Sequence, residues 1–191
     1  MPDSKNTRLS RKDWIQAALA AIAEGGVAAV AVEPLAARLG TTKGSFYWHF
    51  ANRDALLQAA LAQWEEQTTT VVISEIKNTP DEPIDRLRRL IARVVTVAEQ
   101  DAVGPALIAN ARHPAVKPLL TRVTEARIGV TVELLQGLGF DPDEARFRAM
   151  LAYSAYLGHA QLAHSTPELT AQTEQERRAY LEHVLQALGR R

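Results

Sequence analysis

The chain has 191 residues, of which 47% are hydrophobic, and its 22 Lys and Arg balance its 22 Asp and Glu. It contains no cysteine, which excludes a disulfide framework and a thiolate metal site. No apolar run is long enough for a membrane span, and the polar first residues contain no hydrophobic segment like that of a signal peptide. These features predict a cytoplasmic protein of one large or two small domains, with no membrane partner, no metal and no cofactor.

The zero net charge hides an asymmetry along the chain. Residues 1–53 hold seven Lys or Arg against four Asp or Glu, and residues 54–191 carry the opposite imbalance. A basic end joined to an acidic body is expected when only one end contacts phosphate, although so small an imbalance also arises by chance. The acidic body argues mildly against a strongly anionic small ligand.

The first three predicted helices form one compact pattern. Ser10 and Asp13 have the spacing of a capping box that opens a first helix, and the glycines at 25–26 end it. A second helix begins near Val32 and stops at Gly40, and a third spans roughly residues 43–50. Helix, glycine turn and helix is the arrangement by which proteins place a recognition helix in the major groove of DNA.

Start and stop signals predict six further helices and no strand. A period-two pattern, an internal repeat and a low-complexity tract are all missing. The expected helical ranges are 53–77, 84–100, 104–112, 114 or 118 to 138, 142–164 and 173–188. We therefore predict an all-α protein of about nine helices. Residues 1–53 form a three-helix helix-turn-helix DNA-binding domain, and residues 54–191 form a helical ligand-binding and dimerisation domain.

The segment from Gly40 to Arg53 contains Phe46-Tyr47-Trp48-His49-Phe50 and resembles the TetR family of bacterial transcriptional regulators. The resemblance extends over residues 10–62 in helix order, spacing and motif, and beyond them it rests on length and helix count. It implies a homodimer whose N-terminal domains bind a palindromic operator. It further implies that the C-terminal domains bind a small molecule, which releases the DNA.

The resemblance also implies which residues contact DNA. Lys43 and Gly44 match positions that face base edges, where a Lys donates to O6 and N7 of guanine. Phe46 and Phe50 match core positions, so Tyr47, about 100° away on a helix, is expected outside the core. The alternative is that the aromatic residues only pack. The full set of predicted DNA contacts is Thr42, Lys43, Gly44, Ser45, Tyr47, Trp48, His49 and Arg53.

The second helix departs from the family pattern at its start. Many members have Thr or Ser there, followed by a basic or polar residue, whereas this chain has Val32 and Glu33. Neither side chain is suited to contact phosphate, so base reading by this helix is not expected. Arg38 of this helix could still contact the DNA backbone. For Arg53, the alternative to a DNA contact is an exposed position on the next helix with no role in binding.

Two wide apolar stripes near the C-terminus predict the dimer interface. Stripes of this width suit a four-helix bundle between subunits, and an ordinary intrachain core is the alternative. The predicted interface residues are Met150, Ser154, Leu157, Gly158, Gln161, Leu181, Val184, Leu185 and Leu188.

The helical body is larger than a dimerisation bundle requires, which predicts a ligand cavity. Such cavities are mostly apolar with a few polar groups. Large or polar residues on otherwise apolar helices are the candidates, with surface or ordinary core as the alternative. They are Trp64, Asn110, Arg127 and Tyr153.

Together these features predict a ligand-responsive transcriptional repressor that binds operator DNA as a homodimer. The alternative is a helix-turn-helix protein whose body binds a protein partner, such as a nucleoid or division factor. No Gly-rich phosphate loop or nucleophile elbow occurs, so an enzyme is not expected. His159 and His164 are five residues apart and do not share a helix face, so a metal site between them is not expected either.

Overall fold

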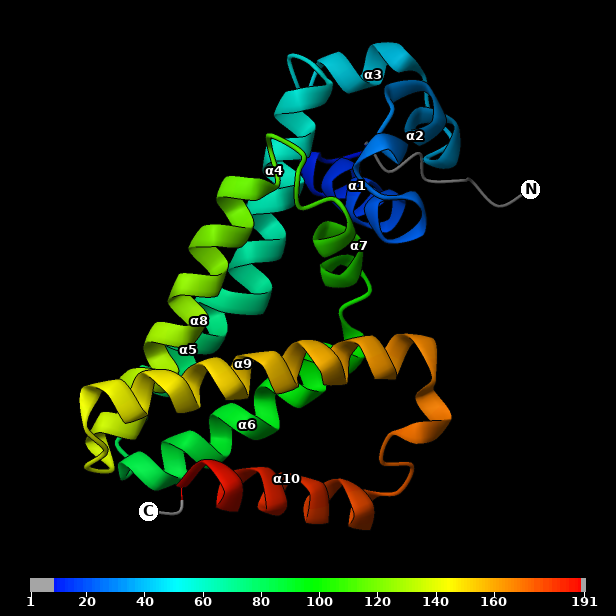
Figure 1. The fold of residues 1–191 in the computed structure, drawn as a ribbon. Helices are drawn as coiled ribbons and strands as arrows, with labels where there is room; N and C mark the ends of the chain where they lie inside the picture. Colours follow the sequence, from blue (N-terminus) through cyan, green and yellow to red (C-terminus); the bar gives the residue numbers. More distant parts are fainter. Residues whose placement is uncertain (1–8, 190–191) are drawn as a thin grey trace.

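The computed structural model describes residues 9–189, and the secondary structure in that range consists of helices joined by turns and loops (Figure 1). Lys5, Arg8 and Asp3, part of the predicted charge asymmetry, lie outside these residues. The helices are α1 (Arg11–Gly25), α2 (Val32–Arg38), α3 (Lys43–Tyr47), α4 (Arg53–Glu65), α5 (Val71–Lys77), α6 (Pro83–Gln100), α7 (Val103–Ala109), α8 (Lys117–Gly137), α9 (Pro142–Ser165) and α10 (Glu174–Gly189). Short turns are η1 (Val27–Ala29), η2 (Glu66–Thr70) and η3 (Pro167–Leu169). The all-α prediction is confirmed.

The helices begin where the sequence placed their caps. The Ser10 amide donates to Asp13 Oδ2 over 2.6 Å, and the Asp13 amide donates back to Ser10 Oγ over 3.4 Å. Asn52 accepts from the amide of Ala55, and Asp141 caps α9 in the same way. These side chains supply acceptors to amides that have no partner inside the helix.

The predicted end of the third helix is wrong, because α3 ends at Tyr47 and not near residue 50. The amides of His49 and Phe50 still donate to the carbonyl of Phe46 over 2.9 and 3.0 Å. The chain therefore tightens into a turn that keeps Phe50 in the core while Asn52 starts the next helix.

The predicted helix over 53–77 is present but contains a π-helical turn. Helix α4, η2 and α5 follow one another without a break, and η2 is the π-helical segment. Counted as one, these segments bring the described residues to nine helices. A π-turn inserts an extra residue into a helix and often lies at a functional site.

Two hydrophobic cores lie within residues 9–189. The first joins α1–α4 around Trp14, Phe46 and Leu57, and it also includes Leu107, Val116, Leu119 and Val123 from the body. The second lies among α5, α6, α8, α9 and α10. In Figure 1 α8 runs beside α4, and α7 packs on α1, so the body shares the core of the N-terminal helices.

Part of the predicted dimer stripe is wrong, because it belongs to the second core. Leu185 and Leu188 are 5% and 4% exposed and face α6, on which α10 packs. Leu181 and Val184 pack against the same core and are half-buried. The stripe on α10 is thus mainly intrachain core. None of the helices within residues 9–189 combines the length and apolarity needed to cross a membrane.

Candidate DNA-binding surface and ligand cavities

Helix α3 is held by a small aromatic core. The Phe46 ring meets Trp14 edge-on at 5.3 Å and stacks on Phe50 at 5.7 Å, and all three side chains are buried. Gly40 has φ +64, a conformation that favours glycine, and this allows the short turn from α2. The turn and the aromatic core fix the direction of α3 relative to α2.

The other side of α3 is open to solvent. Tyr47 and Trp48 are 55% and 83% exposed, so Tyr47 lies outside the core as expected. Thr42, Lys43 and Gly44 are exposed, while Ser45 and His49 are half-buried. Thr42 Oγ1 also caps α3 by accepting from the Ser45 amide over 3.4 Å. Most of the residues predicted to contact DNA from α3 and its flanking turns are therefore accessible to solvent.

Glu33 of α2 forms an ion pair with the predicted base reader. Lys43 Nζ lies 2.8 Å from Glu33 Oε1, and both side chains are more than half exposed. The carboxylate raises the pKa of Lys43 and the ammonium lowers the pKa of Glu33. The acid that departs from the family pattern therefore orients Lys43 across the α2–α3 surface.

Arg53 has a structural position that the sequence did not indicate. Its Nε donates to the Val30 carbonyl over 2.6 Å, Nη2 to the Val27 carbonyl over 2.8 Å, and Nη1 to Asp54 Oδ1 over 3.1 Å. Three of the five N–H groups of the Arg53 guanidinium thus donate within the chain, and two of them tie the start of α4 to the turn around η1. We therefore propose a structural role for Arg53 beside the DNA contact that the resemblance implies. Arg38, similarly, pairs with Glu24 through two 2.7 Å hydrogen bonds.

Two neighbouring cavities lie in the body. The first, which we call the apolar cavity, lies between α5, α6, α8, α9 and α10 and is lined mainly by aliphatic residues such as Val72, Leu87, Ile91 and Val130. The second, the junction cavity, lies where α4, α7, α8 and α9 meet, and Trp64, Asp101 and Leu120 are among its lining residues. Arg127, Tyr153 and Tyr156 line both. Three of the four predicted ligand residues, Trp64, Arg127 and Tyr153, are thus brought together at these cavities.

Arg127 of α8 is the centre of a polar cluster between the two cavities. Nε donates to Thr69 Oγ1 over 3.0 Å, Nη1 to the Tyr156 hydroxyl over 3.1 Å, and Nη2 to the carbonyl and hydroxyl oxygens of Thr68 over 3.2 and 3.0 Å. The guanidinium also faces the rings of Trp64 and Tyr156 at 5.5 and 5.4 Å. Thr68 and Thr69 belong to the π-helical turn η2, so the cluster connects the cavities to the helix that leads to α3.

Thr68, Thr69 and Tyr156 were not predicted. Tyr156 lies three residues after Tyr153 on α9, near the same face, and the two rings stack at 5.9 Å. That spacing in the sequence would have pointed to Tyr156. The two threonines carry no such signal, because only the π-turn directs them toward α8.

The prediction for Asn110 is wrong, because this residue lines neither cavity. Its Nδ2 donates to the Ala106 carbonyl over 2.8 Å at the end of α7. A Cβ at Gly26 would come within 2.8 Å of the same atom, so the side chain packs against the end of α1. Its polarity reflects this helix-end contact.

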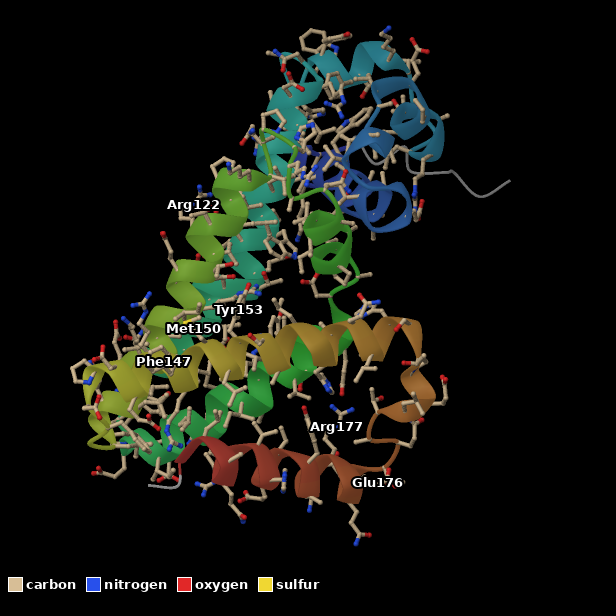
Figure 2. The ribbon with its side chains drawn as sticks, in the orientation of Figure 1. Arg122, Phe147, Met150, Tyr153, Glu176 and Arg177 are labelled. Atoms are coloured by element: carbon tan, nitrogen blue, oxygen red, sulfur yellow. The ribbon has the colours of Figure 1, made fainter. Side chains whose placement is uncertain are left out.

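A buried polar cluster closes the far end of the apolar cavity. His159 is buried and stacks on Tyr180 at 5.4 Å, and its Nε2 has no hydrogen-bond partner and lies 3.6 Å from Glu99 Oε1. Arg177 of α10 (Figure 2) holds the other Glu99 oxygen at 2.6 Å. Burial raises the pKa of Tyr180. Within residues 9–189 no three His, Asp or Glu side chains form a metal-binding group.

The outer face of α9 carries several of the large apolar side chains that are exposed within residues 9–189. Phe147 and Leu151 are 63% and 64% exposed, and Met150 and Leu162 are also exposed (Figure 2 marks Phe147 and Met150). Ser154, Gly158 and Gln161, three of the predicted interface residues, are exposed, and Gln161 also lines the junction cavity. Leu157 is half-buried and also lines the junction cavity.

Comparisons with known proteins agree with this geometry. Residues 15–60 match the model of the family described as bacterial regulatory proteins, tetR family. The HTH-type transcriptional regulator TtgR of Pseudomonas putida is 30% identical over 93 residues, which are 49% of this chain and 44% of that protein. The chain therefore matches less than half the length of this relative.

Solved structures extend the similarity to the whole fold. A transcriptional regulator from Rhodococcus sp. Rha1 superposes with a TM-score of 0.72 at 23% identity, covering 94% of each chain. The ketosteroid transcriptional regulator KstR2 of Mycobacterium tuberculosis gives a TM-score of 0.71 at 22% identity, covering 95% of each chain. At these identities the superpositions establish the fold.

Proposed function

We propose that this chain, whose residues 15–60 match the model of the bacterial regulatory proteins of the tetR family, is a transcriptional repressor controlled by a small molecule. The observation that carries the proposal is the accessible surface of α3, where Lys43, Gly44 and Tyr47 lie opposite a buried aromatic core. A side chain such as Lys43 reads guanine from the major groove, and the hydroxyls of Thr42 and Ser45 suit phosphate.

We propose that the active form is a homodimer joined through the outer face of α9. Several exposed apolar side chains on one helix face are costly in a monomer and typical of a contact between subunits. A two-fold dimer presents two α3 helices, which favours a palindromic operator with half-sites about one helical turn apart.

Selection of bound sites from random duplex DNA tests the DNA-binding proposal. We expect an inverted repeat whose half-sites are protected in a footprint. Lys43→Ala should cost about 1–3 kcal/mol at the base it reads and relax specificity there. Equal losses on the selected site and on random DNA would count against base reading, and the absence of any enriched site would overturn the proposal.

We propose that the effector binds in the apolar and junction cavities. The π-helical turn η2 lines the apolar cavity and also belongs to the continuous helix that reaches α3. A ligand that moves this turn changes the placement of α3, and coupling of about 1–3 kcal/mol weakens operator affinity roughly 5–150-fold.

Linkage supplies the test of effector control. Operator DNA must weaken ligand binding by the same factor by which the ligand weakens DNA binding. Titrating a ligand with and without operator measures this factor, and identical affinities in the two titrations would rule out control by that ligand. If a broad ligand panel leaves the melting temperature unchanged, the body instead binds a protein partner.

A further inference from the structure

Arg127 is a half-buried cation without an acidic partner among residues 9–189. All of its hydrogen-bond acceptors are neutral oxygens, from Thr68, Thr69 and Tyr156. Arg122, one turn earlier on α8, shows the contrast, because it pairs with Glu65 over 2.6 Å. A cation that is removed from water without a counter-charge is costly to the fold.

Within residues 9–189 none of the groups around Arg127 forms an ion pair with it. Burial raises the pKa of Tyr156, so its hydroxyl is a neutral phenol at neutral pH. Asp101, the acid of the junction cavity, accepts from Trp64 Nε1 over 2.9 Å and from the amides of Val103 and Gly104. These contacts hold the Asp101 carboxylate at the start of α7, and it forms no ion pair with Arg127. The rings of Trp64 and Tyr156 contribute only cation–π attraction.

Arg127 lies at the wall of the apolar cavity, whose lining is mainly aliphatic. The apolar cavity offers aliphatic side chains from α5, α6 and α8, among them Val72, Leu87, Ile91 and Val130. A guanidinium at the wall of such a cavity presents parallel N–H donors that match the two oxygens of a carboxylate. A single cation balances a monoanion better than a doubly charged phosphate.

We propose that the effector is an amphipathic monocarboxylate whose carboxylate binds Arg127 and whose apolar body fills the apolar cavity. This inference rests on the proposed effector control and specifies its ligand. The net negative charge of residues 54–191 does not oppose it, because the charge at the cavity wall is that of Arg127.

The contacts of Arg127 also indicate how the ligand acts. A bound carboxylate competes with Thr68 and Thr69 for the guanidinium N–H groups. Both threonines lie in the π-helical turn η2, which then loses the hydrogen bonds that join it to α8. The effect of the ligand therefore begins in the helix that carries the N-terminal domain.

Paired probes that differ only in charge test the ligand class. Calorimetric titrations use octanoate against 1-octanol and 2-naphthoate against 2-naphthylmethanol, on the full chain. In the wild type at least one carboxylate should bind roughly tenfold or more tightly than its alcohol, because a hydrogen bond to a charged group is stronger than one to a neutral group. Alcohols that bind as tightly as their carboxylates, or a failure of both carboxylates to bind, would overturn the proposal without any variant.

Two variants locate the site. Arg127→Gln should lose the preference for carboxylate and keep its affinity for the alcohol, whereas Arg122→Gln on the same helix should behave as the wild type. Melting temperatures check that both variants fold. A preference that persists in Arg127→Gln would place the carboxylate elsewhere and refute the role of Arg127.

Hydrogen exchange provides an independent readout of the coupling. Octanoate or 2-naphthoate should raise amide exchange in residues 66–74 of the wild type and leave it unchanged in Arg127→Gln. The carboxylate preference is measured without DNA. If the protein selects no operator, that result refutes the proposed function and leaves the carboxylate inference standing. Conversely, release from a selected operator by neutral compounds alone would refute the carboxylate and keep the effector control.

Discussion

Replacing Arg53 by alanine separates two roles for this residue. In the structure its guanidinium donates to the carbonyls of Val30 and Val27 over 2.6 and 2.8 Å and so ties the start of α4 to the turn around η1. If Arg53 instead contacts phosphate, as the family resemblance implies, its loss changes DNA binding and leaves the fold intact. The two roles predict opposite results in two measurements.

The structure sets the size of the effect on stability. Hydrogen bonds to charged groups contribute about 1.5–3 kcal/mol each when shielded, and those of Arg53 are only partly shielded because its side chain is 36% exposed. The ion pair with Asp54 lies at the surface and adds at most about 1 kcal/mol. We expect Arg53→Ala to lower the free energy of unfolding by about 1.5–3 kcal/mol. For a chain of this length each kcal/mol lowers the melting temperature by about 2–4 °C.

Urea denaturation followed by circular dichroism measures the loss at a fixed protein concentration. Arg178→Ala is the matched control, because Arg178 forms an exposed pair with Glu174 one turn away on α10 and should cost only about 0.3–0.5 kcal/mol. The salt dependence of operator binding should keep its slope in Arg53→Ala, since no phosphate contact is lost. An unchanged unfolding midpoint together with a slope reduced by about one would refute the structural role.

Three further predictions follow from single contacts. Glu33→Gln frees Lys43 and removes an acid from the α2–α3 surface. Fluorescence anisotropy should therefore show tighter binding to random DNA with a steeper salt dependence. Unchanged binding would mean that the ion pair has no effect on DNA binding. Gly158→Arg adds a charge to the outer face of α9, where a Cβ meets nothing within 4 Å. Light scattering should show a monomer, and circular dichroism should show unchanged helical content. A persistent dimer would exclude this face as the interface. Gly40→Ala should lower stability by about 1 kcal/mol because φ is +64, whereas Gly129→Ala inside α8 should not; equal urea midpoints would contradict the strain.

Local signals predicted the helices well, because a cap is a contact between residues three apart. Ser10 with Asp13 and Asn52 with Ala55 form the bonds that their spacing indicates. The exposure of Tyr47 also followed from the 3.6-residue period, because Phe46 occupies the buried side of the short helix α3. The predicted helices lie within a few residues of their observed bounds for this reason.

Local sequence signals could not predict contacts between helices that are distant in the sequence. Leu185 and Leu188 belong to a stripe that suits a partner subunit and α6 equally well, and only the packing of α10 on α6 decides between them. Asn110 and Arg127 are both polar residues on apolar helices, yet one caps a helix end and the other faces two cavities. The π-turn that brings Thr68 to Arg127 has no signature in a run of polar residues.

The first hydrophobic core has a consequence for protein engineering. Leu107, Val116, Leu119 and Val123 lie outside the predicted DNA-binding domain, yet they fill its core. A chimera that joins residues 1–53 to the body of another regulator loses these side chains and exposes the apolar face of α1 to whatever replaces them. Changing the operator preference of this scaffold is therefore better done by substituting the exposed residues of α3 than by transplanting the domain. A sensor built by exchange must carry α7 and the first turns of α8 along with the helix-turn-helix.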